Sequence, residues 1–251
     1  MNKPEVQTCY SPALYDLYHD PEAIVVIVDV LRATSAICTA IHHGVKMMVP
    51  VAGIEEAKAY KSRGFLVACE RDAIKQDGFD FGNSPLSFIT PEIQGKTIAI
   101  STTNGTQAIE AAKKAATIVI GSFLNLSALS NWLIHQNKKV VILCAGWKNR
   151  YNMEDTLFAG ALSKNLIESG AFYTHCDASI SAAHLYQLGG NDLFGFLENS
   201  SHRKRLQNLH LEDDIRFCLQ LDYTAVIPVF KGEGLIDMQP EVHGISWGRN
   251  N

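Results

Sequence analysis

The chain has 251 residues, of which 47% are hydrophobic and 19% are charged, and its formal net charge is −4. These values are ordinary for a globular protein, and they exclude the strongly basic surface that is typical of nucleic-acid-binding domains. Since no run of 18 or more apolar residues occurs, we expect no membrane span.

The amino terminus and the cysteines predict a cytoplasmic protein. Residues 1–20 contain no basic segment followed by an apolar one, so they do not resemble a signal peptide. The six cysteines are widely spaced without a CxxC pattern, and we expect reduced and mostly packed thiols.

Apolar strands alternate with helical patterns over the first two-thirds of the chain. Strands are predicted at 23–31, 46–51, 65–69, 96–101, 116–121 and 138–146, and helices at 34–43, 54–62, 105–115, 123–136 and 154–169. The strand candidates are almost continuously apolar, which is typical of strands covered on both faces. We therefore predict an α/β fold with a mainly parallel sheet flanked by helices.

The last third of the chain has a different pattern. Residues 177–220 look helical throughout. Two short strands and a tail are predicted after them, at 223–230, 234–238 and 243–251. We predict an α/β core of residues 1–170 and a helix-rich C-terminal part of residues 171–251, either a subdomain or packed on the core as one domain.

Polar residues follow four of the predicted strands. The strand ends read "DVLRATS" from Asp29, "ERD" from Glu70, "STTNGT" from Ser101 and "CAGWKNRYNMED" from Cys144. Open α/β sheets bind ligands beyond the carboxyl ends of their parallel strands. A carboxylate such as Asp29 in an apolar run is costly to bury unless a cation, a metal or hydrogen bonds compensate it. The sequence therefore predicts an active site at this edge.

Two of these motifs have a structural interpretation beside a functional one. The hydroxyls and glycine of residues 101–106 precede a helix, where they can bind an anion or simply cap the helix. Glu154 and Asp155 open another helix, where carboxylates either bind a hard metal or complement the helix dipole.

Two further features are ambiguous, and one nucleotide signal is absent. The loop of residues 77–86, with Asn83 and Ser84, is either a turn or a substrate-binding loop. Cys144 is either a nucleophile or a packed strand residue. No strand is followed by GxGxxG and no Walker A sequence occurs, so a nucleotide-dependent transferase is not expected.

Five short blocks resemble a known family. "VDVLRATS", "FDFGNSP", "TTNGT" and "CAG" followed by "ED" occur in this order between residues 28 and 155. They resemble the blocks of the 2-phosphosulfolactate phosphatase family. The resemblance implies an α/β, magnesium-dependent phosphatase that hydrolyses 2-phosphosulfolactate, or a related small phosphorylated acid. It also implies a homo-oligomer, expected to be a dimer, and a role in coenzyme M biosynthesis where that cofactor is made.

The resemblance and the strand-end positions together suggest roles for individual residues. Asp29, Arg32 and Glu70 are the catalytic candidates, and Asp29, Glu154 and Asp155 are the candidate Mg²⁺ ligands. The substrate-binding candidates are Asn83, Ser84, Thr102, Thr103, Asn104, Gly105, Thr106, Cys144 and Gly146. Asp29 either attacks phosphorus or holds Mg²⁺, and "DVLR" lacks the second acid of the DxD pattern used by haloacid dehalogenase phosphatases.

The anionic substrate needs local positive charge because the chain as a whole is mildly acidic. Arg32, Arg71, Lys148 and Arg150 follow strand ends and could supply it with Mg²⁺. Two other classes stay open at this point: a non-catalytic anion-binding α/β protein, and a thiol-dependent enzyme that uses Cys144.

Overall fold

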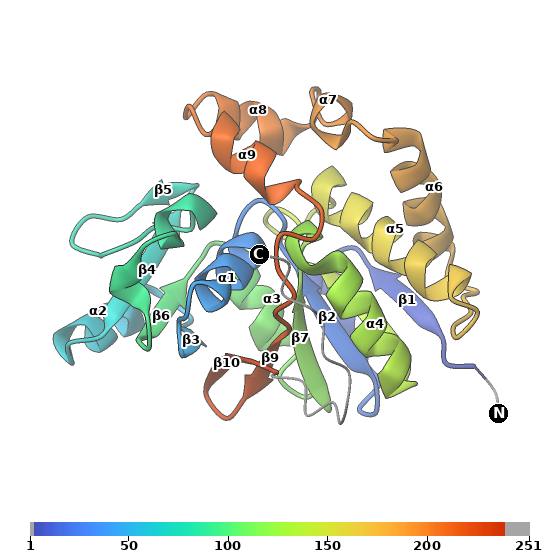
Figure 1. Cartoon of the computed structure of the whole chain (residues 1–251), viewed down its shortest axis with the longest axis horizontal. Coiled ribbons are helices and arrows are strands. Elements are labelled where there is room, and N and C mark those ends of the chain that lie inside the picture. The colour runs from blue at the N-terminus through green and yellow to red at the C-terminus, as the bar shows by residue number, and fades with distance from the viewer. Residues whose placement is uncertain (1–2, 239–251) are drawn as a thin grey trace, which may run out of the picture.

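The computed structural model describes residues 3–238, so the predicted tail at 243–251 lies outside the described residues (Figure 1). A ten-stranded sheet runs through the described part of the chain. In order across the sheet, the strands are β1 (Val6–Cys9), β8 (Val140–Cys144), β2 (Ile24–Val28), β7 (Thr117–Gly121), β9 (Pro228–Lys231), β10 (Gly234–Asp237), β3 (Met47–Pro50), β6 (Thr97–Ser101), β4 (Leu66–Arg71) and β5 (Ile74–Lys75).

The sheet is mainly parallel and is covered on both faces, which confirms the predicted α/β fold. Strands β1, β8, β2 and β7 pair in parallel, and so do β3, β6 and β4. All five residues of β2 are buried. Its side chains alternate between two hydrophobic clusters, because successive residues of a strand point to opposite faces. This explains why the run is continuously apolar.

An antiparallel hairpin lies in the middle of the sheet. Strands β9 and β10, from the end of the described chain, pair with each other and separate the two parallel groups. Val229 pairs with Val119 of β7, and Leu235 pairs with Met48 of β3. The short strand pair predicted from the sequence is thus a central part of the sheet.

Helices flank the sheet (Figure 1). They are α1 (Ala33–His42), α2 (Ile54–Ser62), α3 (Gly105–Ala111), α4 (Leu126–Gln136), α5 (Met153–Glu168), α6 (Asp177–Gly189), α7 (Leu193–Phe196), α8 (Ser201–Gln207) and α9 (Glu212–Cys218). Four short 3₁₀ helices are η1 (Pro12–Leu17), η2 (Pro85–Phe88), η3 (Pro91–Ile93) and η4 (Phe123–Asn125). The predicted helical stretch at 177–220 is therefore four helices separated by breaks.

Helix α6 packs against α5 through a glycine. A Cβ atom on Gly160 would lie 2.0 Å from the carbonyl oxygen of Ala182, so only glycine permits this close approach. The chain then continues through α7 to α8 and α9, which lie at the top of Figure 1. The division of the chain at residue 170 stays a prediction.

Two elements were not predicted from the sequence. The residues of β1, "VQTC", form no apolar run, and their strand is defined by its parallel register with β8. Strand β5 has two exposed residues and exists because a two-residue turn folds it back onto β4. Strand β1 depends on pairing with a distant strand, and β5 depends on a local turn. Neither has the composition of a buried strand.

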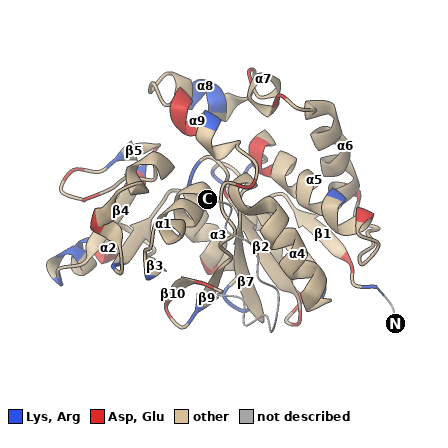
Figure 2. Cartoon of the chain, in the orientation of Figure 1, with Lys and Arg blue, Asp and Glu red and all other residues tan. Residues whose placement is uncertain are grey.

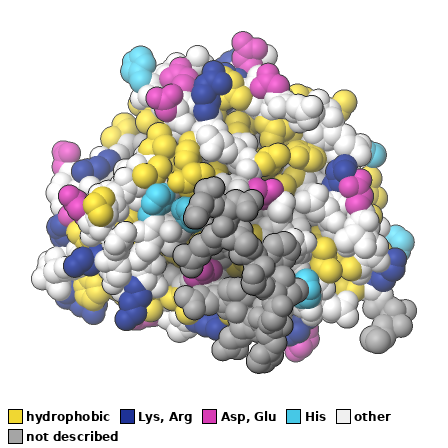
Figure 3. Space-filling model, viewed as in Figure 1, with side chains coloured by type: hydrophobic (Ala, Val, Ile, Leu, Met, Phe, Trp, Pro, Cys, Tyr) yellow, Lys and Arg dark blue, Asp and Glu magenta, His cyan; other side chains and the backbone are white. Residues whose placement is uncertain are grey.

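The surface charge and the helix hydrophobicity agree with what the composition predicts. Basic and acidic side chains are scattered over the face shown in Figure 3, and neither kind dominates it. Among residues 3–238, no helix combines the length and the hydrophobicity that crossing a bilayer requires.

Candidate active site

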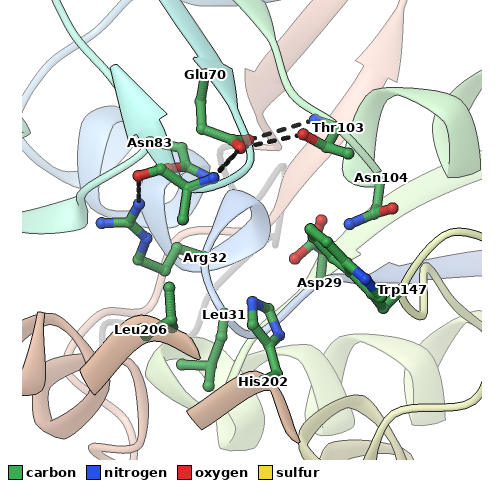
Figure 4. Close-up of a pocket in the computed structure, with 11 residues that line it drawn as sticks. Asp29, Leu31, Arg32, Glu70, Asn83, Thr103, Asn104, Trp147, His202 and Leu206 are labelled. Atoms are coloured by element: carbon green, nitrogen blue, oxygen red, sulfur yellow. Dashed lines mark hydrogen bonds between the residues drawn. The ribbon is translucent and has the colours of Figure 1, made fainter. Parts of the chain in front are cut away.

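A pocket lies at the edge of the sheet that the sequence predicted (Figure 4). Its lining residues are Asp29, Leu31, Arg32, Glu70, Ala73, Asn83, Thr103, Asn104, Trp147, His202 and Leu206. About 270 Å³ of space there is free of protein atoms, part of it open to solvent.

Asp29 lies directly after β2 and is 6% exposed. Its backbone is fixed at the start of α1, because its N–H donates to Thr34 Oγ1 (3.2 Å) and its carbonyl accepts from the Thr34 N–H (2.9 Å). Among the described residues, no donor forms a hydrogen bond with its carboxylate. Burial, and then the charge of Asp155, raise the pKa of Asp29, while His202 opposes the rise. This carboxylate therefore needs a proton or a cation.

Asp155 joins the loops that follow β2 and β8. Its Oδ1 accepts the Val30 N–H (2.9 Å), and its Oδ2 accepts the Gly146 N–H (3.1 Å) and the Asn152 side-chain amide (2.9 Å). Burial raises the pKa of Asp155, and these three hydrogen bonds oppose the rise. Because both oxygens are engaged, Asp155 fits a positioning role beside Asp29 better than that of a metal ligand.

Glu154 is completely buried beside His202. Its Oε1 pairs with His202 Nδ1, whereas its Oε2 has no hydrogen-bond partner among the described residues. Figure 2 shows the acidic first turn of α5, which carries Glu154, below the charged helices α8 and α9. His202 lines the pocket and Glu154 does not, so His202 lies between Glu154 and the pocket.

Glu70 holds three loops together. Its Oε1 accepts the Ala73 N–H (2.5 Å) and the Thr103 hydroxyl (3.0 Å), and its Oε2 accepts the Asn83 amide and the Thr103 N–H (both 3.3 Å). With four donors on one carboxylate, Glu70 shapes the pocket wall. The Oδ1 atom of Asn83 is buried without a partner among the described residues, so it is free to accept from a ligand.

Arg32 forms a buried ion pair that the sequence did not reveal. Its Nη1 pairs with Asp214 of α9, and its Nη2 donates to the Ala73 carbonyl (2.7 Å). The Ser84 hydroxyl donates to the other oxygen of Asp214 (2.7 Å). Asp214 thus offsets the charge of Arg32 and joins α9 to both predicted site residues.

Two tight turns form the rim of the pocket. Asp72 and Ala73 connect β4 to β5 with φ values of 53° and 71°, and Lys148 and Asn149 have φ values of 50° and 62°. Two consecutive positive φ values are typical of type I′ turns, and the absence of glycine makes both turns strained. Lys148 Nζ lies 3.4 Å from Asp72 Oδ1, so the two turns meet.

Thr102 and Thr106 contact each other away from the pocket. The Thr106 N–H donates to Thr102 Oγ1 (3.2 Å), and the Thr106 hydroxyl donates to the Thr102 carbonyl (3.0 Å). These bonds cap α3. Gly105 packs against the site, because a Cβ there would lie 2.7 Å from Ala33 Cβ and 3.0 Å from Asp29 Oδ2. Of this motif, Thr103 and Asn104 line the pocket.

Cys144 and Gly146 lie behind the pocket wall. Cys144 is 1% exposed, and burial followed by the charge of Asp155 raises the pKa of its thiol well above the usual value. The thiolate is the nucleophilic form, so a thiol-dependent mechanism is disfavoured. Gly146 has φ +62°, and a Cβ there would lie 2.2 Å from the Arg150 carbonyl oxygen.

The donor set fits a hard cation with few protein ligands. Within residues 3–238, no group of three or more His, Cys, Asp or Glu side chains is arranged to hold a metal. Mg²⁺ is usually held by one or two carboxylates together with waters and substrate phosphate oxygens. Among residues 3–238, neither the Asp29 carboxylate nor Glu154 Oε2 accepts a hydrogen bond, and of the two residues Asp29 lines the pocket.

The C-terminal helices supply residues that sequence reasoning missed. His202 and Leu206 of α8 line the pocket, Asp214 of α9 pairs with Arg32, and Trp147 lines the side next to Asp29 (Figure 4). The spacing of His202 and Leu206, four residues apart on one helical face, was a signal that could have placed them together.

Comparison with known proteins gives one consistent result. The model of the 2-phosphosulpholactate phosphatase family matches residues 9–233. Two similar proteins, each named probable 2-phosphosulfolactate phosphatase, come from Caldanaerobacter subterraneus and Thermotoga maritima. The first is 38% identical, covering 84% of this chain and 88% of its own length. The second is 41% identical, covering 81% of this chain and 87% of its own length. A third, from Picosynechococcus, has the same name and is 35% identical, covering 88% of this chain and 96% of its own length.

The ion pair between Arg32 and Asp214 is expected to stabilise the fold. Replacing Asp214→Asn leaves a buried guanidinium without its counter-charge, which commonly costs about 3–5 kcal/mol. Urea unfolding should show this loss in the free energy of unfolding. Asp213→Asn, the same change at the adjacent exposed position, should stay within about 0.5 kcal/mol of the wild type. Equal losses in both variants would contradict the assignment.

Proposed function

The chain belongs to the 2-phosphosulfolactate phosphatase family, whose members are phosphoric monoester hydrolases, and we propose that it hydrolyses 2-phosphosulfolactate or a closely related small phosphorylated acid. The products would be sulfolactate, or the corresponding hydroxy acid, and phosphate. The observation that carries the proposal is the Asp29 carboxylate, which has no hydrogen-bond donor in the described part of the chain and lies in a pocket beyond the strand ends. It lies in the first sequence block that resembles the family.

Charge balance supports Mg²⁺ as the cofactor. The proposed substrate is densely anionic, and it would enter a pocket that already contains Asp29 and Glu70. Arg32 does not offset these charges alone, because Asp214 pairs with it. A bound divalent cation would balance them, and Asp29 is the carboxylate in the pocket that would hold it. When bound, Mg²⁺ would neutralise charge on the phosphoryl oxygens.

The chain's own residues have separable tasks in phosphoryl transfer, which depends mainly on positioning and charge stabilisation. Asp29 lies at the reacting group, either attacking phosphorus or holding the cation. Glu70 accepts the Thr103 hydroxyl and N–H, and so fixes the loop after β6 at one side of the pocket. Asn83 Oδ1 is free to accept from the substrate. His202, with Nδ1 bound to Glu154, lines the same pocket and is the candidate for proton transfer to the leaving group.

Two parts of the proposal are supported by the family resemblance alone, namely a homodimer and a contribution to coenzyme M biosynthesis. A cytoplasmic location is proposed from the widely spaced cysteines. Non-catalytic anion binding is the competing function, and the same pocket would serve it. Measurement of turnover separates the two functions directly.

Asp29→Asn should reduce kcat by about 100- to 1,000-fold, the usual loss when one electrostatic transition-state contact is removed. The amide keeps the size of the side chain but cannot carry its negative charge. Steady-state phosphate release, with folding checked by circular dichroism, makes the measurement. Asp16→Asn, at an exposed position on η1, is the matched control and should keep the wild-type rate. A near-normal rate for Asp29→Asn would contradict the role.

Phosphate release should occur from 2-phosphosulfolactate and stop when the divalent metal is removed. The assay compares a panel of phosphorylated small acids with added Mg²⁺ and after exhaustive chelation. Release that returns on adding Mg²⁺ is the expected result. Release from no member of the panel would refute the phosphatase activity, whereas release that persists after chelation would refute only the need for the metal.

A further inference from the structure

Helix α8 presents three residues on one face. His202, Arg205 and Leu206 are three and four positions apart, the spacing that places side chains above one another on a helix. His202 and Leu206 line the pocket. Arg205 therefore lies at the border of the same pocket, on a helix to which the sequence analysis gave no function.

The guanidinium group of Arg205 stacks on Trp147. Its Cζ lies 3.5 Å from the centre of the Trp147 ring, and Trp147 itself lines the pocket. A cation held over an aromatic face is fixed in its plane, and its N–H bonds stay free to point outward along that plane.

Two nitrogens of this guanidinium are free to bind a ligand. Nε and Nη2 are buried, and neither donates a hydrogen bond to any of the described residues. In arginine these two atoms form one edge, and their parallel N–H bonds match two oxygens of a carboxylate, sulfonate or phosphate. Burying such a pair unmatched is unfavourable, so the edge is suited to an anionic ligand.

The neighbouring cations are already engaged. Arg32 pairs with Asp214, and Arg71 donates to the Ser101 carbonyl (3.3 Å) and hydroxyl (2.9 Å). Lys148 is exposed and lies 3.4 Å from an Asp72 carboxylate oxygen. Arg205 differs from these three because two of its buried nitrogens donate to nothing within residues 3–238.

The surrounding acids favour the charged form of Arg205. Burial lowers the pKa of Arg205, and the charges of Glu154, Asp72 and Glu70 oppose that change. Of these acids, Glu70 lines the pocket, whereas Glu154 lies behind His202 and Asp72 lies in the turn after β4. Arg205 therefore provides positive charge where Asp29 and Glu70 would otherwise repel an anion.

We infer that Arg205, oriented by Trp147, binds the second anionic group of the substrate, a carboxylate or a sulfonate, while the phosphate lies beside Asp29. This inference rests on the proposed phosphatase function and adds a residue that determines specificity. It gives the C-terminal helices a direct part in choosing among phosphate esters. A phosphate monoester without a second anion would leave the Arg205 edge unfilled.

The test combines two variants with three substrates. Arg205→Met removes the charge and keeps an unbranched side chain on Trp147, whereas Lys204→Met removes a charge from an exposed position of the same helix. The substrates are 2-phosphosulfolactate, 2-phospholactate and isopropyl phosphate, which carry two, one and no anionic groups beside the phosphate. Comparison of the first two shows whether the carboxylate or the sulfonate is the partner.

Arg205→Met should lower kcat/KM about 10- to 100-fold for substrates that carry the recognised anion, as expected for lost charge-assisted hydrogen bonds, and mainly through KM. Its kcat/KM for isopropyl phosphate should stay within about twofold of the wild type, as should that of Lys204→Met for all three substrates. An equal loss on isopropyl phosphate would overturn the inference, because the residue would then act on the phosphate or on the fold.

Binding separates a failure of this inference from a failure of the phosphatase proposal. If the wild type hydrolyses none of the three esters, the proposed function fails, and calorimetric titration with sulfolactate still tests Arg205. Wild-type binding that weakens at least about tenfold in Arg205→Met supports the inference. Undetectable binding to the wild type, or equal binding to both proteins, overturns it.

Discussion

The burial of the Asp29 carboxylate at the end of β2 is the constraint on which the rest of the site depends. Neighbouring carboxylates raise the cost of ionising it, and no donor among the described residues offsets that cost. Asp155 accepts hydrogen bonds from the loops around Asp29. Asp214 neutralises the charge of Arg32. Compensation for Asp29 must therefore come from outside the chain, as a proton or a cation. A carboxylate left uncompensated in this way is well matched to a metal and a phosphate ester that arrive together.

The C-terminal part of the chain completes this site in two ways. The hairpin of β9 and β10 fills the middle of the sheet, so the two parallel groups that carry the strand-end loops are held in one sheet. Helices α8 and α9 then cover the pocket edge with His202 and Leu206 and lock Arg32 through Asp214. The helical segment whose purpose the sequence left open is thus a wall of the pocket.

Sequence patterns predicted the parts of the site that depend on local order. The continuous apolar run before Asp29 identified a buried strand, and polar residues at successive strand ends placed Glu70 and Thr103 at the same edge. The patterns did not show Asp214 or His202, because their partners, Arg32 and Glu154, are 182 and 48 residues away along the chain. These pairs form because the packing of α8 and α9 brings His202 and Asp214 next to their partners. Sequence patterns can also suggest a site that is not there. The hydroxyls of Thr102 and Thr106 resemble an anion-binding motif, but they form hydrogen bonds within the start of α3.

The most direct test is the protonation of Asp29 itself. In metal-free protein with ¹³C-labelled aspartate, the Asp29 carboxyl resonance can be assigned by its absence from Asp29→Asn. Its titration midpoint should lie well above the ordinary value of about 3.9, because burial and the charge of Asp155 disfavour ionisation, and Mg²⁺ should move it to lower pH. A midpoint near 3.9 without any metal would show that the carboxylate is already compensated by the protein, and would contradict this account.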